Sequence, residues 1–402
     1  MDQTELFPLP TAVSPSPSLR VLDTRMRGVT FVEHRVKAIV NSPESTGMGF
    51  WSINPYIGCE FGCTYCYARY AHRYAIERMH GDGQISDADL SRFRESEKWE
   101  VFEHHIFVKQ RDAVLAALER DLSRIRRRQV GGQIHPIVIG TATDPYQPAE
   151  RQYRITRAVL TRLREESNLS IGIITKSPQI CHDIDVLREL QRNNRVSVYI
   201  SLITTDTRLI KLFEARSPMP HVRLKALKRL TDANLNAGLI VAPVLPGITD
   251  TVPQIRALVQ ALKDAGGRFA HPSPLRLYPA LHRGFLPIIE KNFPELYPKY
   301  RRAYRGAGIV PKRYTDAILN RFRKIANEFG ISVNDPMMKA IGRAGGQAGG
   351  RADGRTVRPL PSDRRDEGRS GGGPPCGVEG WSGPAGMVSK GGGGPPGWVV
   401  GW

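Results

Sequence analysis

"NPYIGCEFGCTYCYAR" (residues 54–69) contains three of the five cysteines of the 402-residue chain, Cys59, Cys63 and Cys66. A disulfide uses two cysteines and a structural zinc site uses four ligands, so three closely spaced thiolates match neither arrangement. In a four-iron cube, three protein thiolates leave one iron open to a reactant. Because thiolates select iron–sulfur clusters, zinc or cuprous copper, the residues alone leave these alternatives open.

Around this stretch, short apolar runs alternate with amphipathic segments. The apolar runs are continuous, which is typical of parallel strands buried on both faces, and the segments between them repeat apolar residues at helical spacing. This pattern predicts an α/β fold of right-handed βαβ units, as a partial or full (β/α) barrel or an open doubly wound sheet. The expected strands span residues 51–58, 135–144, 169–177, 195–204, 237–250 and 274–280. The expected helices span residues 64–79, 109–128, 149–167, 178–193, 221–234, 252–266, 285–305 and 315–330.

The composition divides the chain into four expected segments. Residues 1–25 are rich in Pro and Ser, and residues 342–402 are rich in Gly and Pro, so both are predicted to be disordered tails. Residues 26–285 are expected to form the core, with the cysteine loop at residues 58–67. Residues 286–341 are expected to be a C-terminal helical extension.

The net charge of +19 resides mainly in the predicted folded part. From Ile341 onward, eight Lys and Arg oppose five Asp and Glu, which leaves about +16 for residues 1–340. A field of this sign favours nucleic acid as a partner, although a generally basic, arginine-rich proteome explains it equally well. The scarce, unevenly placed cysteines predict a reducing cytoplasm, and neither a targeting signal nor a membrane span is expected.

Five blocks of the chain resemble a known family. The spacing Cys-x-x-x-Cys-x-x-Cys, with Tyr65 directly before the last cysteine, is similar to the signature of the radical S-adenosylmethionine (SAM) superfamily. In order, the blocks that resemble the spore photoproduct lyase-like family, often labelled "DNA repair photolyase", are "NPYIGCEFGCTYCYAR", "IGTATDPYQPAE", "IITKS", "EARSPMPHVRLKAL" and "VLPGITD". The resemblance runs from about residue 50 to residue 280.

The resemblance implies a partial (β/α)6 barrel with mostly parallel strands, and a [4Fe-4S] cluster on Cys59, Cys63 and Cys66 as the catalytic metal centre. The open iron of such a cluster binds SAM. One electron then cleaves SAM to methionine and a 5′-deoxyadenosyl radical that abstracts a hydrogen atom from the substrate. A reductant such as flavodoxin or ferredoxin is the implied electron source.

The same resemblance implies SAM-binding roles for two residues at strand ends. Lys176 matches the family lysine that binds the SAM carboxylate, and a compact ammonium suits that role. Ser201 matches a hydroxyl that contacts the same carboxylate, although a serine bonded to its own backbone competes with this interpretation.

Four further residues are candidates for the cofactor site. Tyr65 and Tyr67 flank the last cysteine, where the family places adenine contacts, and core packing is the alternative. Thr143 and Asp144 follow an expected strand, where the Asp144 carboxylate would bind SAM or substrate or cap the following helix. Glu214 and Arg216 are expected to form an ion pair that orders a loop, and clamping of an anionic substrate is the alternative.

The match breaks down at one functional position. Spore photoproduct lyase uses a cysteine after its second barrel strand as a hydrogen donor, whereas the corresponding segment here, "IGTATDPYQP", has none, and Cys181 lies in a later helix. Thymine-dimer repair is therefore not carried over. The substrate is predicted to be nucleic acid, with a peptide, a cofactor precursor or a metabolite as alternatives. A remote alternative is a non-catalytic zinc module that binds nucleic acid and uses His72 as a fourth ligand.

Overall fold

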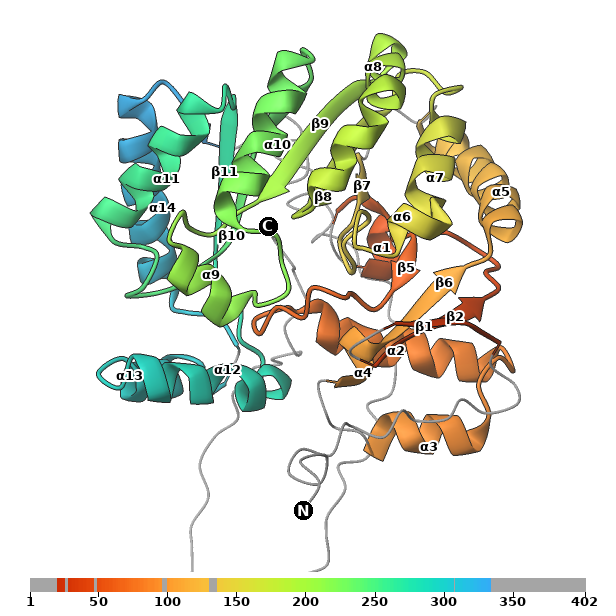
Figure 1. The fold of residues 1–402 in the computed structure, drawn as a ribbon, viewed down its shortest axis with the longest axis horizontal. Coiled ribbons are helices and arrows are strands. Elements are labelled where there is room, and N and C mark those ends of the chain that lie inside the picture. Colours follow the sequence, from red (N-terminus) through yellow and green to blue (C-terminus); the bar gives the residue numbers. More distant parts are fainter. Residues whose placement is uncertain are drawn as a thin grey trace, which may run out of the picture.

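Two sheets form the fold, a mostly parallel one of eight strands and a four-stranded one beside it (Figure 1). The computed structural model describes residues 20–25, 28–46, 49–95, 100–129, 136–306 and 308–333. The larger sheet has the strand order β12-β11-β10-β9-β8-β7-β4-β3. Its strands are β3 (Val40–Asn41), β4 (Trp51–Ile53), β7 (Ile137–Ile139), β8 (Ser170–Thr175), β9 (Arg195–Ser201), β10 (Asn236–Val244), β11 (Phe269–Pro274) and β12 (Ser332–Val333).

Every strand pair of the larger sheet is parallel except β3 with β4 at one edge. Within the described residues, the edge strands β3 and β12 do not pair with each other, so the sheet does not close. The prediction of an α/β fold with mostly parallel strands in a partial barrel is therefore confirmed.

The continuous apolar runs of the central strands are explained by burial on both faces. Ile139 and Val198 pack in the main hydrophobic core, whereas Val138 and Tyr199 pack in a second cluster with Phe269. Adjacent residues of one strand point to opposite faces, so each strand needs apolar residues at consecutive positions.

Helices surround the strands of the larger sheet (Figure 1). Long amphipathic segments form them because one apolar stripe packs against the sheet while the other face is solvated. The described helices are α1 (Pro43–Thr46), α2 (Ala68–Gly81), α3 (Asp87–Glu95), α4 (Glu100–His104), α5 (Arg111–Gln129), α6 (Glu150–Tyr153), α7 (Ile155–Leu163), the 3₁₀ helix η2 (Pro178–Asp183), α8 (Ile184–Asn193), α9 (Thr207–Phe213), α10 (Pro220–Asp232), α11 (Val252–Asp264), α12 (Pro279–Asn292), α13 (Tyr297–Ala303) and α14 (Lys312–Glu328). None of the helices in this described part is long and apolar enough to cross a membrane.

The smaller sheet was not predicted. Its strand order is β1-β2-β6-β5, and its strands are β1 (Val21–Arg25), β2 (Val29–His34), β5 (Tyr56–Ile57) and β6 (His105–Lys109). Strand β2 pairs in parallel with β6, and in this register Thr30 lies opposite His105, 75 residues further along the chain. The strand Val21–Arg25 corrects the prediction of disorder over residues 1–25, because this strand pairs with β2.

The prediction of one strand over residues 51–58 is wrong. The segment breaks at Asn54 and Pro55 into β4 and β5, which belong to different sheets. Proline lacks a backbone N–H, so it interrupts a ladder of strand hydrogen bonds. The Asn54 side chain stabilises the backbone at this break, because its carbonyl oxygen accepts a hydrogen bond from the Ala142 backbone N–H at 2.7 Å.

The last predicted strand, residues 274–280, is displaced. Strand β11 ends at Pro274, and the following residues lead into α12. Leu275 and Leu277 are buried in this connection, so their apolar character reflects burial outside a strand. The two prolines in "FAHPSP" concealed the real strand.

Two predicted helices are interrupted, and the helical stretch expected around residues 285–305 is formed by α12 and α13, which residues 293–296 separate. The helix over residues 149–167 divides into α6 and α7 at Arg154, whose φ of 51° is left-handed. The segment 178–193 begins as the 3₁₀ helix η2 and continues as α8. The predicted boundary at residue 286 lies inside α12, so it does not separate two units of secondary structure. The tail predicted over residues 342–402 lies outside the described residues.

Candidate cysteine-loop site

The cysteine loop, residues 58–67, connects β5 to α2 and turns tightly at two glycines. Gly58 has a φ of 86°, and a Cβ there would lie 2.7 Å from the His105 carbonyl oxygen, so only glycine fits. Gly62 also has a positive φ, of 59°. The turns bring the three cysteines close enough to interact electrostatically, and the loop contacts Thr143 and Lys176 next to the carboxyl ends of β7 and β8.

Side chains from the loop after β7 hold the cysteine loop in place. The Thr143 hydroxyl donates to the Gly58 carbonyl oxygen at 2.6 Å. The Gln147 side chain accepts from the Glu60 backbone N–H at 2.9 Å and donates to the Thr143 hydroxyl at 3.0 Å. Thr143 therefore contacts the cysteine loop, and these bonds assign it a positioning role.

The three thiols are free and close enough to influence one another. Cys59 and Cys63 are buried and Cys66 is partly exposed. Burial raises the pKa of Cys63 to about 11, although the Lys176 ammonium opposes this rise. Burial, Asp144 and the other two thiols raise the pKa of Cys59 well above its usual value. Because burial disfavours the thiolate forms of Cys59 and Cys63, a positively charged partner is needed to stabilise them as thiolates.

This donor set fits an iron–sulfur cluster. Among the residues that the structure describes, no three His, Cys, Asp or Glu side chains converge as ligands of one metal ion. Thiolates that bind a cluster each contact a different iron, so they do not have to converge on one point. The Cys63 sulfur also lies 3.7 Å from the Ser217 hydroxyl, which is the kind of hydrogen bond that tunes a ligating thiolate.

Lys176 lies beside the cysteine loop, at the end of β8. Its Nζ is 5.8 Å from the centre of the Tyr65 ring. Burial disfavours its charge, but Cys63 and Glu214 outweigh burial and raise the pKa of Lys176 above its usual value. The side chain is therefore a cation held next to the thiols.

A buried ion pair contacts the cysteine loop through Tyr65. Arg223 on α10 contacts Glu214, and both side chains are 0% exposed. Glu214 also accepts from the Tyr65 hydroxyl, and Arg223 donates to the Ser201 carbonyl oxygen at 2.8 Å. Burial opposes the ionisation of Glu214, but Arg223 and Lys176 hold its pKa below the usual value.

The expected pair of Glu214 with Arg216 is wrong. Arg216 instead binds Glu103 at 2.9 Å, and Glu103 also binds Arg69 at 2.6 Å. The Arg69 Nε donates to the Cys63 carbonyl oxygen at 3.3 Å, so this second network also contacts the cysteine loop. Sequence reasoning missed Glu103 and Arg223. The quoted block "EARSPMPHVRLKAL" contained Arg223, whereas no sequence pattern marked Glu103.

Asp144 is engaged with the protein. Its carboxylate accepts from the Tyr146 backbone N–H at 2.9 Å, the Thr175 hydroxyl at 2.6 Å and the Lys176 backbone N–H at 2.7 Å. Burial raises its pKa, and the three hydrogen bonds oppose the rise. These contacts join the ends of β7 and β8 and orient the backbone at Lys176, so they favour a structural role over the expected ligand contact.

The remaining candidate residues lie on the same edge of the sheet. The Tyr67 hydroxyl donates to the Thr141 carbonyl oxygen, and Ser201 is the buried last residue of β9. Tyr65 is buried next to Glu214. Every candidate therefore lies in the loop or at the carboxyl end of β7, β8 or β9. His72, the ligand of the zinc alternative, packs edge-on against Phe102 with ring centres 5.4 Å apart.

Comparisons with known proteins agree with this architecture. The model of the radical SAM superfamily matches residues 53–259. An uncharacterized protein of Mycobacterium tuberculosis is 27% identical over 307 residues, which cover 76% of this chain and 82% of that protein. An uncharacterized protein of Methanocaldococcus jannaschii is 24% identical over 298 residues, which cover 74% of this chain and 94% of that protein.

Solved structures of spore photoproduct lyase share the fold. A mutant of that enzyme with bound AdoMet and dinucleoside spore photoproduct has a TM-score of 0.53 and 16% identity, covering 75% of this chain and 81% of the other. The complex of spore photoproduct lyase with dinucleoside spore photoproduct also has a TM-score of 0.53. At this level of identity, the likeness establishes the fold.

The ion pair of Arg223 and Glu214 predicts a large effect on stability. Arg223→Ala leaves a buried carboxylate without its partner, so the free energy of unfolding should fall by about 3–5 kcal/mol in urea denaturation. The control is Arg164→Ala, which breaks a pair with Glu189 whose side chains are 41% and 42% exposed, and it should cost less than about 1 kcal/mol. Replacing both buried partners, as Arg223→Met with Glu214→Leu, should recover part of the loss. Equal losses in all three variants would contradict the interpretation.

Proposed function

The chain belongs to the radical SAM superfamily, and on this basis we propose that Cys59, Cys63 and Cys66 hold a [4Fe-4S] cluster with one iron open to SAM. Membership makes the protein an enzyme of radical SAM chemistry, which implies an iron–sulfur cluster and SAM as cofactors. A bound cluster would supply the electron for reductive cleavage of SAM to methionine and a 5′-deoxyadenosyl radical capable of hydrogen abstraction, and Cys59, Cys63 and Cys66 would hold that cluster. The observation that carries the proposal is the group of three free, mutually interacting thiols beside Lys176.

The residues around the loop have distinct proposed tasks. Lys176 binds the SAM carboxylate, since it is a cation next to the thiols and its charge is retained despite burial. Tyr65 and Tyr67 line the adenine site with their rings, while their hydroxyls are held by Glu214 and the Thr141 carbonyl. Ser201 adds a contact to SAM from the end of β9.

Thr143 and Asp144 act mainly on protein groups in this proposal. Thr143 fixes the backbone of the cysteine loop at Gly58, and Asp144 orients the backbone at Lys176. They would hold the thiols and the Lys176 ammonium at fixed positions relative to each other, and they would help to exclude water from the reacting groups. A flavodoxin or ferredoxin would deliver the electron, in a cytoplasmic setting that suits the scarce cysteines.

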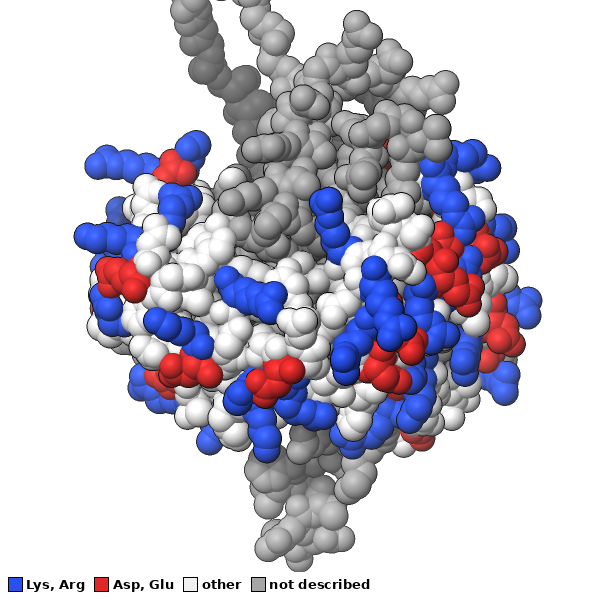
Figure 2. Space-filling view, turned by 90° about the horizontal axis from the view of Figure 1, so that it is seen from above, with Lys and Arg blue, Asp and Glu red and all other residues white. Residues whose placement is uncertain are grey.

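Nucleic acid is the substrate class that the charge favours. Residues 1–340 carry about +16, and Figure 2 shows Lys and Arg, interspersed with Asp and Glu, around a mostly uncharged centre of one face. The substrate step would differ from that of spore photoproduct lyase, because the loop after β7 has no cysteine. Cys181 does not substitute for it, since it is buried and its sulfur lies 3.6 Å from the Ala226 carbonyl oxygen.

The cluster proposal predicts that the three loop cysteines act together. The triple variant Cys59→Ala, Cys63→Ala, Cys66→Ala should bind no iron and form no 5′-deoxyadenosine after anaerobic reconstitution with dithionite and SAM. The matched control is Cys181→Ala, which should keep both properties because its sulfur faces α10. A wild type that binds a full cluster but forms no 5′-deoxyadenosine would contradict the mechanism. Zinc bound to the thiols would contradict the cluster itself.

The role of Lys176 predicts a loss of SAM affinity without a loss of iron. Lys176→Gln removes the charge opposite the SAM carboxylate, so SAM should bind about tenfold more weakly or worse in equilibrium dialysis. The control Lys228→Gln removes an exposed lysine that is paired with Asp232 on α10. Wild-type SAM affinity in Lys176→Gln would remove this residue from the proposed site.

The nucleic-acid proposal predicts binding that depends steeply on salt. Single-stranded DNA should bind at low ionic strength, and its affinity should fall about twentyfold between about 50 and 200 mM salt if three phosphates are neutralised. Fluorescence anisotropy with a labelled oligonucleotide measures this slope. Absence of binding at low salt, or affinity that is independent of salt, would favour an uncharged substrate class.

A further inference from the structure

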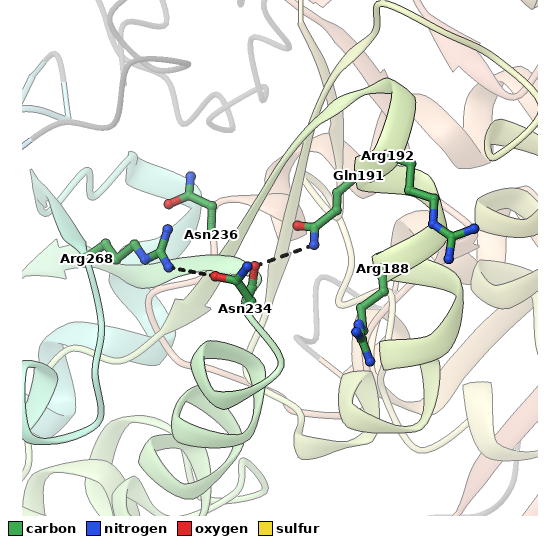
Figure 3. Close-up of a pocket in the computed structure, with 6 residues that line it drawn as sticks. All are labelled: Arg188, Gln191, Arg192, Asn234, Asn236 and Arg268. Atoms are coloured by element: carbon green, nitrogen blue, oxygen red, sulfur yellow. Dashed lines mark hydrogen bonds between the residues drawn. The ribbon is translucent and has the colours of Figure 1, made fainter.

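A polar hollow of about 480 Å³ lies at the end of the larger sheet opposite to the cysteine loop (Figure 3). Asn236 is the first residue of β10 and Arg268 directly precedes β11, so this hollow is at the amino ends of the parallel strands. The opposite wall comes from the end of α8. The lining residues are Arg188, Gln191, Arg192, Asn234, Asn236 and Arg268.

The hollow concentrates uncompensated positive charge. Three of its six lining residues are arginines and none is acidic. All three arginines are exposed, and none of them lies within 4.0 Å of a carboxylate of the residues that the structure describes. The hollow is therefore a basic site on a chain whose other arginines often have acidic partners.

Carboxylates on the adjacent helices are engaged elsewhere. On α8, Asp185 binds Arg157 at 2.8 Å and Glu189 binds Arg164. On α10, Asp232 binds Lys228 at 2.9 Å. These three carboxylates are held by other cations, and the Asp264 carboxylate on α11 accepts from the Gln260 amide at 2.7 Å. Among the described residues, none of the four forms an ion pair with an arginine of the hollow.

Stability of the helix accounts for only part of this arrangement. Arg192 is in the last turn of α8, where a cation complements the helix dipole. Arg188 lies four residues earlier, and two like charges at this spacing repel each other on a helix. Arg268 comes from a different element, so the helix dipole does not explain its position. Three arginines from two elements favour an external anion as the missing partner.

Hydrogen bonds to Asn234 hold the two walls of the hollow relative to each other. Asn234 has a left-handed φ of 60° between α10 and β10, and its side-chain oxygen accepts from an Arg268 guanidinium nitrogen at 3.2 Å. Its backbone oxygen accepts from the Gln191 amide at 3.5 Å. Figure 3 shows Arg268 and Gln191 directed toward Asn234 from opposite sides, so this residue joins the two walls.

We propose that this hollow binds a phosphate group of an anionic ligand, with Arg188 and Arg268 as the principal contacts. A guanidinium presents several N–H donors in a planar fork that matches phosphate oxygens, which makes arginine the preferred residue for such sites. The hollow has the size of a small-ligand site. The proposal goes beyond the proposed radical SAM function and does not depend on it, since neither SAM nor a cluster is involved.

The test measures inorganic phosphate binding by the anaerobically purified full-length protein. Calorimetric titration with phosphate is run against sodium chloride at matched ionic strength. Wild type should bind phosphate, and Arg188→Gln with Arg268→Gln should bind about a hundredfold more weakly, a factor of about ten for each charged hydrogen bond lost. Circular dichroism checks that the double variant is folded, and either single variant replaces it if it is not.

The matched control removes the same charge from another surface. Arg313→Gln with Lys324→Gln changes two exposed basic residues of α14 and should leave phosphate affinity unchanged. The proposal is overturned if wild type binds phosphate no better than chloride. It is equally overturned if the two double variants lose affinity to the same extent, because the effect would then be one of net charge.

Two competitors distinguish the source of the phosphate. A single-stranded DNA oligonucleotide that displaces phosphate from wild type, while a nucleoside triphosphate does not, identifies a nucleic-acid backbone as the ligand. Displacement by the triphosphate alone identifies a small phosphorylated molecule. If phosphate binds and neither competitor displaces it, the site takes free phosphate. Phosphate binding can be measured in a protein that forms no 5′-deoxyadenosine. Failure of the phosphate-site proposal can therefore be distinguished from failure of the radical SAM proposal.

Discussion

The buried ion pair of Glu214 and Arg223 is the constraint on which the cysteine site depends. A carboxylate without water is costly unless its charge is neutralised and its oxygens accept hydrogen bonds. Arg223 meets the first condition, and Tyr65 helps to meet the second. Because Tyr65 belongs to the cysteine loop and Arg223 also binds the carbonyl of Ser201, one pair connects the loop, β9 and α10. The thiols are thus held by an electrostatic network and by packing.

Local patterns in the sequence were sufficient for the central strands of the parallel sheet, whereas β3 and β12 were not predicted and β11 was misplaced. The strands β7, β8, β9 and β10 were predicted because each is apolar at consecutive positions, and the topology then brought the carboxyl ends to one edge. Lys176 lies next to the cysteine loop for this reason, since it directly follows β8. Helix lengths were less predictable, because a single left-handed residue, Arg154, divides α6 from α7.

The contacts that the sequence did not reveal are those between distant segments. Glu103 pairs with Arg216 across 113 positions, and β2 pairs with β6 in a sheet that joins the N-terminal segment to the region after α4. A charged residue in an amphipathic stretch has many possible partners, and only the fold selects one. The neighbour in sequence was therefore a poor guide for Glu214, which binds the arginine nine residues away instead of Arg216. Short strands such as β5, with two residues, also carry too little pattern to detect.

Asp144 illustrates how a conspicuous residue at a strand end can serve the site indirectly. A carboxylate that binds a ligand needs free acceptor capacity directed at that ligand, and Asp144 already accepts from three protein donors on two segments. Two of those donors belong to Thr175 and Lys176, so the carboxylate fixes the backbone from which the Lys176 side chain extends. Burial raises the pKa of Asp144, and loss of its ionised form would weaken all three bonds together. The same buried charge also raises the pKa of Cys59, so a cationic partner for the thiols would stabilise both groups at once.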